Sequence, residues 1–504
     1  MQVMLSEISA LLSGSYLVGD DVEVIGVSHD SRRIGRGFLF AAMRGTLLNG
    51  INFVNDALTR GAVAVLVSER YLDSSYIPDE IPKIVVPSVR QALGETSALI
   101  YGRPSQKLNL IGITGTNGKT TTSFLLDAAL SQIGMRTGII GTIEFRSANK
   151  REPSTFTTPE APDLQAMLSE MAENGVDAVS MEVSSHGLDQ RRVDSSHFRI
   201  GIFTNLTAEH LDYHGTIEQY YFAKAQLFEP SRCDFAIISI DDPWGERLAS
   251  QLAIPHVTYG TREDADYVVG DIKVSHHGTC FSIRHQDKYF ALSTQIVGGL
   301  NALNATAAFI AATELGGEPT QVKLGIEGCT SVAGRFQLIE AGQPSMVVVD
   351  YAHTPDAISQ LVKTVRSLIG DTGRVLVVGG ARGGRDRLKR PALGRALAEA
   401  DLVILTTDNP GDEDPHDIIS ELLLGTLDVA SRHIHIEISR SAAIEFALRN
   451  ASSSDAVIIV GRGHETSIRV GRNQIHLDDR EVVRLAAQQI FGIQNAQEVQ
   501  ELAR

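Results

Sequence analysis

The sequence predicts an α/β protein made of three domains, and three observations support that fold class. The chain has 504 residues, which at roughly 150 residues per domain corresponds to about three domains. Short β-branched runs alternate with helical patterns, as in sheets covered by helices. A glycine-rich segment also follows one of the β-branched runs and precedes a helical pattern. Loops between a strand and a helix are where α/β sheets bind ligands. We place the domains at residues 1–88, 89–333 and 334–504.

The composition is that of a folded protein with an acidic surplus. Hydrophobic residues make up 43% of the chain, and 45 Lys and Arg stand against 61 Asp and Glu, for a net charge of −16. This charge argues against a nucleic-acid coat or a binder of anionic membranes. Three scattered cysteines predict neither a disulfide framework nor a zinc site. With no signal peptide and no apolar run near ~20 residues, we expect a cytoplasmic monomer without membrane insertion or a nucleic-acid partner.

The elements follow in order along the three domains. In the first domain, the runs at 61–67 and 83–88 predict two strands. In the second, a buried strand at 108–114 leads into the glycine segment, residues 267–292 alternate as antiparallel strands do, and 301–315 has a helical pattern. Further strands of this domain are predicted at 176–183, 201–205 and 235–240.

The third domain alternates strand and helix throughout. Its helical patterns include PDAISQLVKTVRSLIG and DDREVVRLAAQQIFG. Such alternation predicts a Rossmann-like, doubly wound and mostly parallel sheet. The predicted strands are 346–349, 375–379, 402–407, 433–437 and 456–461.

The glycine segment has the features of a phosphate-binding loop. Its glycines let backbone N–H groups surround phosphate oxygens at a helix N-terminus. Lys119 is placed to span the β- and γ-phosphates and Thr120 to bind Mg²⁺. Ile113 stands at the first glycine of the full G-x-x-x-x-G-K-[ST] pattern, so the loop is a variant that predicts ATP or GTP binding. Its candidate residues are Gly115, Thr116, Asn117, Gly118, Lys119, Thr120 and Thr121.

Three polar clusters follow predicted strands, at 181–188, 204–215 and 350–356. Ligands of doubly wound sheets bind at such strand ends, and the Glu182 carboxylate there is suited to Mg²⁺. Taken alone, Glu182 also fits a helix-cap acid, and a lone His210 or His353 is more often a packed histidine than a ligand. Their occurrence together with the phosphate loop favours one shared site.

The chain resembles the Mur ligase family, and most closely its members that add a third amino acid. The resemblance covers nearly the whole chain and depends on the order of its segments. These segments are DSRRIGRGFLFAAMRG, TGTNGKTTT, FTTPEAPDL, MEVSSHGLDQRR, TNLTAEHLDYHGTIEQYYFAKAQLF, GGLNALNATAA, GRFQLI, VVVDYAHTPDAI, GRDRLKRP, TTDNPGDEDP and GRGHET.

The resemblance implies a UDP-binding N-terminal domain, a central P-loop ATPase sheet and a C-terminal domain that binds the incoming amino acid. It implies that ATP phosphorylates the D-glutamate carboxylate of UDP-MurNAc-L-Ala-D-Glu, and that a free amino acid attacks the acyl phosphate to form an amide bond in peptidoglycan synthesis. Lys119 and Mg²⁺ would offset the repulsion between carboxylate and γ-phosphate. ATP and Mg²⁺ are therefore the expected cofactors.

The resemblance also assigns residues. Lys224 matches a lysine that the family carbamylates, which turns a cation into a carboxylate-like metal ligand; otherwise it is a surface helix lysine. Lys119, Glu182, His210 and Lys224 are the implied catalytic residues, and Thr120, Glu182, His210 and Lys224 the implied metal ligands. Asn301, Arg335 and Asp350 are implied near ATP, which would bridge two domains and assemble the site on closure. The implied UDP-MurNAc-dipeptide contacts are Ser28, Asp30, Ser31, Arg32, Thr157, Thr158, Ser184, Gln190 and Arg192.

The choice of amino acid stays open. Family members that add meso-diaminopimelate usually carry D-N-P-R, whereas this chain has Gly411 in place of the arginine. The loss of a bidentate charge-assisted pair would weaken recognition of the distal carboxylate by ~1.5–3 kcal/mol. The missing arginine favours L-lysine as the added amino acid, unless Arg382 replaces it in binding the distal carboxylate. The acidic run 412–414 either favours a substrate with a cationic side chain or is a solvated loop. The implied amino-acid-binding residues are Arg385, Asp408, Asn409, Gly461 and Glu465.

Two other functions compete with a tripeptide-forming ligase. One is an ATP-dependent amide ligase outside the wall pathway, of the folylpolyglutamate type. The other is a nucleotide-binding scaffold without catalysis. The DSR and TTPE segments favour a UDP-muramoyl substrate, and the presence of Lys119, Glu182, His210 and Lys224 favours catalysis.

Overall fold

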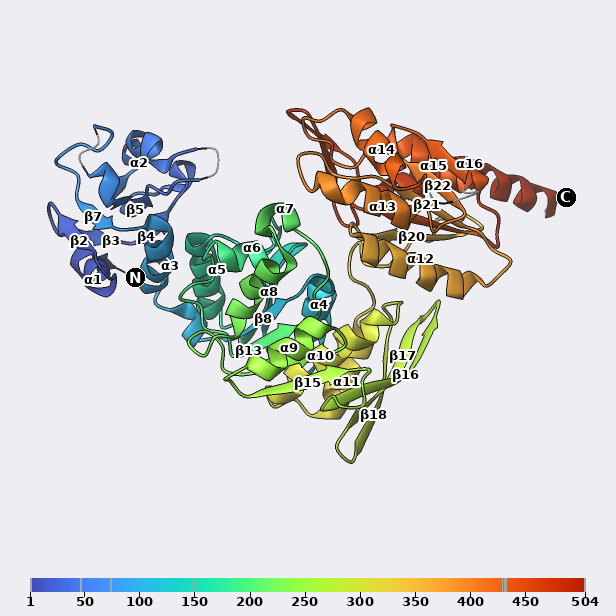
Figure 1. Ribbon diagram of the computed structural model, residues 1–504, viewed down its shortest axis with the longest axis horizontal. Helices are drawn as coiled ribbons and strands as arrows, with labels where there is room; N and C mark the ends of the chain where they lie inside the picture. The colour runs from blue at the N-terminus through green and yellow to red at the C-terminus, as the bar shows by residue number, and fades with distance from the viewer. Residues whose placement is uncertain are drawn as a thin grey trace.

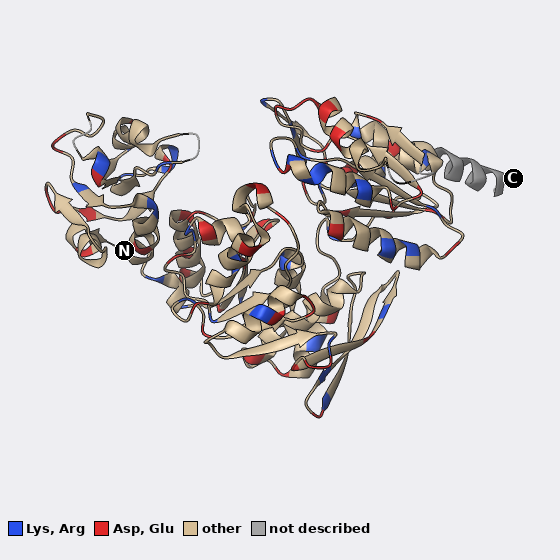
Figure 2. Cartoon of the chain, viewed as in Figure 1, with Lys and Arg blue, Asp and Glu red and all other residues tan. Residues whose placement is uncertain are grey.

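The computed structural model describes residues 2–45, 48–72, 75–148, 150–427, 429 and 433–502. Figure 1 shows three α/β units in chain order, running from blue through green and yellow to red. The predicted α/β class with several sheets is confirmed. Acidic and basic residues are interspersed over all three units in the view of Figure 2. Within the described ranges, no helix has both the length and the apolar character needed to cross a membrane.

The N-terminal unit is a five-stranded sheet in the order β2-β7-β6-β5-β4. Both predicted strands are present, as β6 and β7. Helices α1 and α3 cover one face and α2 the other. Because α3 packs into this core, the unit extends past residue 88. The bounds are α1 Leu5–Leu11, β2 Tyr16–Val18, β4 Gly26–Ser28, β5 Phe38–Ala41, α2 Val54–Thr59, β6 Ala62–Ser68, β7 Lys83–Val86 and α3 Val89–Ile100, with a small ladder of β1 (Val3–Met4) and β3 (Glu23–Val24).

The central unit is an eleven-stranded sheet in the order β11-β10-β9-β12-β8-β13-β14-β15-β16-β17-β18. Strands β9 to β16 run parallel in the middle, and β16, β17 and β18 form the predicted antiparallel segment. The strand bounds are β8 Asn109–Thr114, β9 Thr137–Ile140, β10 Glu144–Ser147, β11 Lys150–Pro153, β12 Ala178–Glu182, β13 Ile200–Phe203, β14 Ala236–Ser239, β15 His256–Gly260, β16 Tyr267–Ser275, β17 Gly278–His285 and β18 Lys288–Thr294.

Helices cover both faces of the central sheet, because its parallel strands are apolar on both sides. Helices α5, α8 and α9 pack on one face, and α4, α10 and α11 on the other. Two short helices, α6 and α7, lie beyond the strand ends. The bounds are α4 Lys119–Gln132, α5 Ala161–Glu173, α6 Ser185–Asp189, α7 Leu211–His214, α8 Ile217–Ala225, α9 Pro243–Gln251, α10 Leu300–Glu314 and α11 Pro319–Gly328.

The C-terminal unit has a sheet in the order β19-β20-β24-β21-β22-β23, parallel except for β19. Helices α12, α13 and α14 cover one face, and α15 and α16 the other, so the predicted doubly wound sheet is confirmed. The bounds are β19 Gln337–Leu338, β20 Met346–Asp350, α12 Pro355–Ile369, β21 Val375–Gly379, α13 Arg390–Leu397, β22 Leu402–Leu405, α14 Pro415–Leu424, β23 His433–Ile436, α15 Arg440–Asn450, β24 Ala456–Val460, β25 Ser467–Val470, β26 Asn473–His476 and α16 Asp479–Leu502.

Candidate active site

The phosphate loop joins β8 to α4 at the centre of the central sheet. Strand β8 has β12 on one side and β13 on the other, which places the loop at the switch point of a doubly wound sheet. At Gly115 (φ +148°), a Cβ would lie 1.9 Å from the Thr204 hydroxyl, so only glycine fits. Lys119 Nζ donates to the carbonyl oxygens of Gly115 at 2.8 Å and Thr116 at 2.9 Å. Ile113, which stands at the position of the first glycine of the motif, is a buried residue of β8. The strand therefore continues through this position, and the loop begins after it.

Lys224 lies directly beneath this loop. Its Nζ, from helix α8, donates to the Gly115 carbonyl at 2.7 Å, and the residue is 1% exposed. It is therefore not a surface lysine. Burial, followed by the charge of Lys119, holds the pKa of Lys224 well below its usual range. A neutral amine is the form that reacts with CO₂, so this environment fits a carbamate.

Glu182, at the end of β12, is 1% exposed and is held by hydroxyl and amide donors. The Thr120 hydroxyl donates to its Oε2 at 3.0 Å, and the Thr142 amide to its Oε1 at 2.8 Å. A carboxylate, a threonine hydroxyl and a carbamate are the hard oxygen ligands that Mg²⁺ prefers. The donor set therefore fits Mg²⁺.

His210 is the N-cap residue that precedes helix α7, and its backbone is left-handed (φ +57°). Its ring centroid is 4.7 Å from that of His186. Burial, then His186 and Lys224, lower the pKa of His210 to about 2, so its imidazole is neutral and able to bind a metal. The neighbouring Glu209 is 4% exposed, and its Oε2 has no hydrogen-bond partner within the described ranges.

Residues of the FTTPE and SSHGLDQRR segments form one polar wall beside Glu182. Arg192 donates to the Thr158 carbonyl at 2.9 Å and to the Gln190 side chain at 2.7 Å. The Ser184 amide donates to the Thr158 hydroxyl at 2.9 Å. The Thr157 and Thr142 hydroxyls lie 3.0 Å apart. The chain thus brings all five predicted dipeptide-binding residues of this domain together.

A cavity of about 1070 Å³ joins these groups to the C-terminal domain. Most of the predicted catalytic, ATP-binding and dipeptide-binding residues line it. Gly115 and Lys224 lie outside the lining, as do Asn409, Gly461 and Glu465. The predicted residues in the lining are Thr116, Asn117, Gly118, Lys119, Thr120, Thr121, Thr157, Thr158, Glu182, Ser184, Gln190, Arg192, His210, Asn301, Arg335, Asp350, Arg385 and Asp408.

The predicted uridine-side residues do not line that cavity. They form a turn after β4, where Ser28 is buried and Asp30 accepts from the Arg32 backbone at 3.0 Å. Hydrogen bonds from Arg32 lower the pKa of Asp30 to about 2. Ser31 is buried in the same turn. An ion pair between Arg33 and Asp163, at 2.7 Å, links this turn to helix α5 of the central domain.

The predicted ATP residues beyond the loop connect two domains. Arg335 donates to the Thr120 hydroxyl at 3.0 Å, and its guanidinium lies 4.6 Å from the Tyr351 ring centroid. Both carboxylate oxygens of Asp350 accept backbone amides, those of Phe336 and Ala352, at 2.6 Å. Asp350 therefore fixes the interdomain linker. The third residue, Asn301, donates to the Val297 carbonyl at 2.8 Å.

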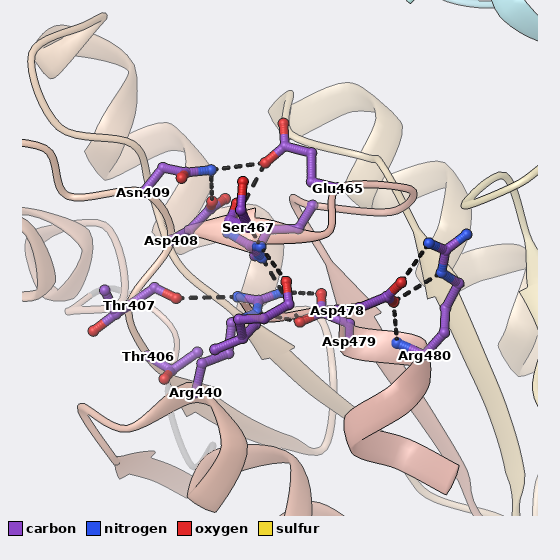
Figure 3. A network of polar contacts seen from close by, with 12 residues as sticks. Thr406, Thr407, Asp408, Asn409, Arg440, Glu465, Ser467, Asp478, Asp479 and Arg480 are labelled. Atoms are coloured by element: carbon purple, nitrogen blue, oxygen red, sulfur yellow. Dashed lines mark hydrogen bonds and ion pairs between the residues drawn. The ribbon is translucent and has the colours of Figure 1, made fainter. Parts of the chain in front are cut away.

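Three of the predicted amino-acid residues, Asp408, Asn409 and Glu465, lie together at the strand ends of the C-terminal sheet (Figure 3). The Asn409 amide donates to Asp408 at 3.3 Å and to Glu465 at 2.7 Å. At Gly461 (φ +104°) a Cβ would lie 2.4 Å from Asp408 Oδ2. Glu465 also pairs with Arg382, whereas Arg385 is exposed at the cavity.

Sequence reasoning missed residues that hold the site together. Lys389 Nζ contacts Glu209 at 2.8 Å across the domain boundary. In the sequence, only its place in the GRDRLKRP segment pointed to a role for this lysine. Tyr351 lay unremarked inside DYAHTPDA. Nothing local marks Thr142, or the buried Arg440, which donates to the carbonyls of Thr407 and Val460.

Three family models match the chain. Residues 113–312 match the Mur ligase middle domain, residues 334–463 the Mur ligase, glutamate ligase domain, and residues 23–101 the Mur ligase family, catalytic domain. A curated relative is the UDP-N-acetylmuramoyl-L-alanyl-D-glutamate--2,6-diaminopimelate ligase of Streptomyces avermitilis. It is 40% identical over 479 residues, which cover 94% of each chain.

Solved structures agree with these matches. A structure of a UDP-N-acetylmuramoyl-L-alanyl-D-glutamate--2,6-diaminopimelate ligase aligns with a TM-score of 0.66 and 32% identity, over 97% of this chain and 99% of that one. The Mycobacterium tuberculosis folylpolyglutamate synthase complexed with ADP and AMPPCP aligns with a TM-score of 0.59 over 79% of this chain and 94% of that one. At 17% identity, the likeness to the synthase concerns the fold alone.

Proposed function

Because the chain belongs to the Mur ligase family of ATP-dependent ligases, we propose that it adds an amino acid to UDP-MurNAc-L-Ala-D-Glu through an acyl phosphate, in peptidoglycan synthesis. One observation carries this proposal. A single cavity joins the phosphate loop, the polar wall of residues 157–158 and 184–192, and the arginine-rich strand ends of the C-terminal domain. A nucleotide, an acceptor carboxylate and an amine have room to meet there.

The residues divide the chemistry among them. Lys119 lies in the loop where the β- and γ-phosphates bind, and it offsets the repulsion as the acceptor carboxylate attacks the γ-phosphorus. Arg192 has a planar fork suited to an anionic group of the acceptor. Thr120, Glu182, His210 and the Lys224 carbamate would hold Mg²⁺, which supplies further positive charge when bound. The amine of the incoming amino acid then displaces phosphate from the acyl carbon and loses a proton.

We propose 2,6-diaminopimelate as the amino acid, as in the names of the relatives. The chain lacks an arginine at Gly411, but Arg469 lies beside that position. The Gly411 amide donates to the Arg469 carbonyl at 3.1 Å, and the Arg469 amide donates to Asn409 at 3.0 Å. The Arg469 guanidinium donates to the Gly471 carbonyl at 3.0 Å and to Asp412 at 3.1 Å, and Arg382 pairs with Glu465. Together with Arg385, which is exposed at the cavity, they are the guanidinium groups of this domain that we propose for the two carboxylates of this substrate.

Phosphate release from ATP tests the proposal. The purified chain is given UDP-MurNAc-L-Ala-D-Glu and Mg²⁺, with meso-diaminopimelate, L-lysine, L-ornithine or no amino acid. We expect release with meso-diaminopimelate and a product heavier by that residue, and no release from a Lys119→Ala variant. Release with L-lysine alone would overturn the amino-acid choice. No release with any amino acid would overturn the acceptor.

A further inference from the structure

Residues Gly141 and Thr142 form a turn that holds the Glu182 carboxylate. The turn joins β9 to β10, and β9 pairs in parallel with β12, so that it lies beside the strand end carrying Glu182. A Cβ at Gly141 would lie 2.5 Å from Glu182 Oε1. Glycine is therefore required for the carboxylate to approach this backbone so closely.

Thr142 contacts both oxygens of the buried carboxylate. Its backbone amide donates to Glu182 Oε1 at 2.8 Å, and its hydroxyl donates to Oε2 at 2.9 Å. The Thr120 hydroxyl donates to the same Oε2 at 3.0 Å. These three bonds fix the plane of the carboxylate, because donors reach it from the phosphate loop on one side and from the turn on the other.

The same hydroxyl reaches the polar wall that faces the acceptor. Thr142 Oγ1 lies 3.0 Å from Thr157 Oγ1. A hydroxyl has one proton, and that of Thr142 is directed to Glu182. The Thr157 hydroxyl therefore donates to Thr142 and presents only its lone pairs to the cavity. The orientation of a group facing the acceptor is thus set by the Glu182 carboxylate.

The turn also touches the C-terminal domain. His464 lies close to the Thr142 backbone, and its ring lies 5.1 Å from that of Tyr351. Tyr351 in turn packs under Arg335, which donates to Thr120. Arg335, Tyr351 and His464 thus connect the phosphate loop to the part of the C-terminal domain that lies beside the turn.

We infer that Thr142 is a positioning residue for the phosphoryl-transfer step. Its hydroxyl holds Glu182 in the orientation that binds Mg²⁺ and ties that orientation to Thr157 on the acceptor side. This inference rests on the proposed function, because the step is defined by its acceptor carboxylate.

The test compares Thr142→Val, which removes the hydroxyl and keeps the branched shape, with Thr142→Ser, which keeps the hydroxyl. Thr313→Val is a matched control, because the Thr313 hydroxyl bonds only carbonyls of its own helix. We expect Thr142→Val to lower kcat at least tenfold and to raise the Mg²⁺ concentration for half-maximal rate severalfold. KM for UDP-MurNAc-L-Ala-D-Glu should rise, with KM for the amino acid unchanged. Thr142→Ser and Thr313→Val should stay within about twofold of the unmodified chain.

Calorimetric titration with ADP gives a readout that needs no acceptor. We expect Thr142→Val to weaken ADP binding in the presence of Mg²⁺ and to leave binding in EDTA unchanged, whereas structural damage would weaken both. Equal weakening in both buffers, or a Thr142→Ser variant as poor as Thr142→Val, would overturn the inference. So would a Thr142→Val variant with unchanged Mg²⁺ dependence. An unmodified chain that releases no phosphate would overturn the proposed acceptor instead, and the ADP titration would still decide the role of Thr142.

Discussion

Replacement of Arg440 by leucine should loosen both loops that surround the amino-acid cluster. The Arg440 side chain is 1% exposed and pairs with Asp479, which is fully buried. Two nitrogens contact Asp479 at 2.8 Å, and the guanidinium also donates to the carbonyls of Val460 at 2.8 Å and Thr407 at 3.3 Å. These carbonyls immediately precede Gly461 and Asp408 (Figure 3). One arginine therefore fixes two strand ends that are separated by β21.

The cost follows from the burial of the pair. Removal of one partner of a buried ion pair costs about 3–5 kcal/mol, because the remaining charge has lost its counterion. After Arg440→Leu, the nearest cation to Asp479 is Arg462, at 3.8 Å. A second change, Asp479→Asn, removes the stranded charge. The double variant should therefore lose less stability than the sum of the two single variants, by about 0.5–3 kcal/mol.

The assay must report on the C-terminal domain itself. Trp244, the only tryptophan, lies on α9 of the central domain, so its fluorescence serves as an internal control. Hydrogen exchange of the β22 and β24 peptides measures the C-terminal domain. We expect faster exchange there, an unchanged Trp244 transition, and a KM that rises more for the amino acid than for ATP. A loss below about 1 kcal/mol, or an equal rise in both KM values, would refute this reasoning.

Three further predictions concern single residues. Lys224→Ala should abolish phosphate release, and added acetate should restore part of it by replacing the carbamate; full activity of the variant would exclude that role. Gly411→Arg should raise kcat/KM for meso-diaminopimelate relative to L-lysine about tenfold. There is space for the new side chain, because nothing lies within 4 Å of a Cβ at this position, but the left-handed backbone (φ +60°) adds ~1–3 kcal/mol of strain. An unchanged ratio of the two kcat/KM values would contradict this prediction. Burial lowers the pKa of the His464 imidazole from 6.5 to about 3. Between these pH values the undocked imidazole binds a proton that the docked one does not. Docking of the C-terminal domain should therefore be intact above pH 6.5 and weaken as the pH falls toward 3. Small-angle X-ray scattering should show a radius of gyration that increases as the pH falls. If the radius of gyration of His464→Gln depends on pH as steeply as that of the unmodified chain, His464 does not control docking.

The sequence predicted those parts of the site that depend on local pattern. The β8 strand, the glycine loop and α4 are consecutive, so hydrophobic runs and glycines reveal them together. The same holds for the strand before Asp350 and the strand before Gly461, where polar residues end an apolar run. Partners far apart in the chain have no such signal. Thr142 and Glu182 are forty residues apart, and Arg440 and Asp479 nearly as many, so packing alone brings them together.

Long-range contacts of this kind also join the central and C-terminal domains, beside the groups that we propose for the reaction. Lys389 and Arg335 are cations bound to the central domain through Glu209 and Thr120, so both depend on the position of the C-terminal domain. Phosphoryl transfer needs positive charge beside the γ-phosphate, and in the proposed reaction the amino acid binds the C-terminal domain. In that reaction, one domain would supply both the positive charge and the amine, so activation of the acceptor would coincide with the presence of the nucleophile.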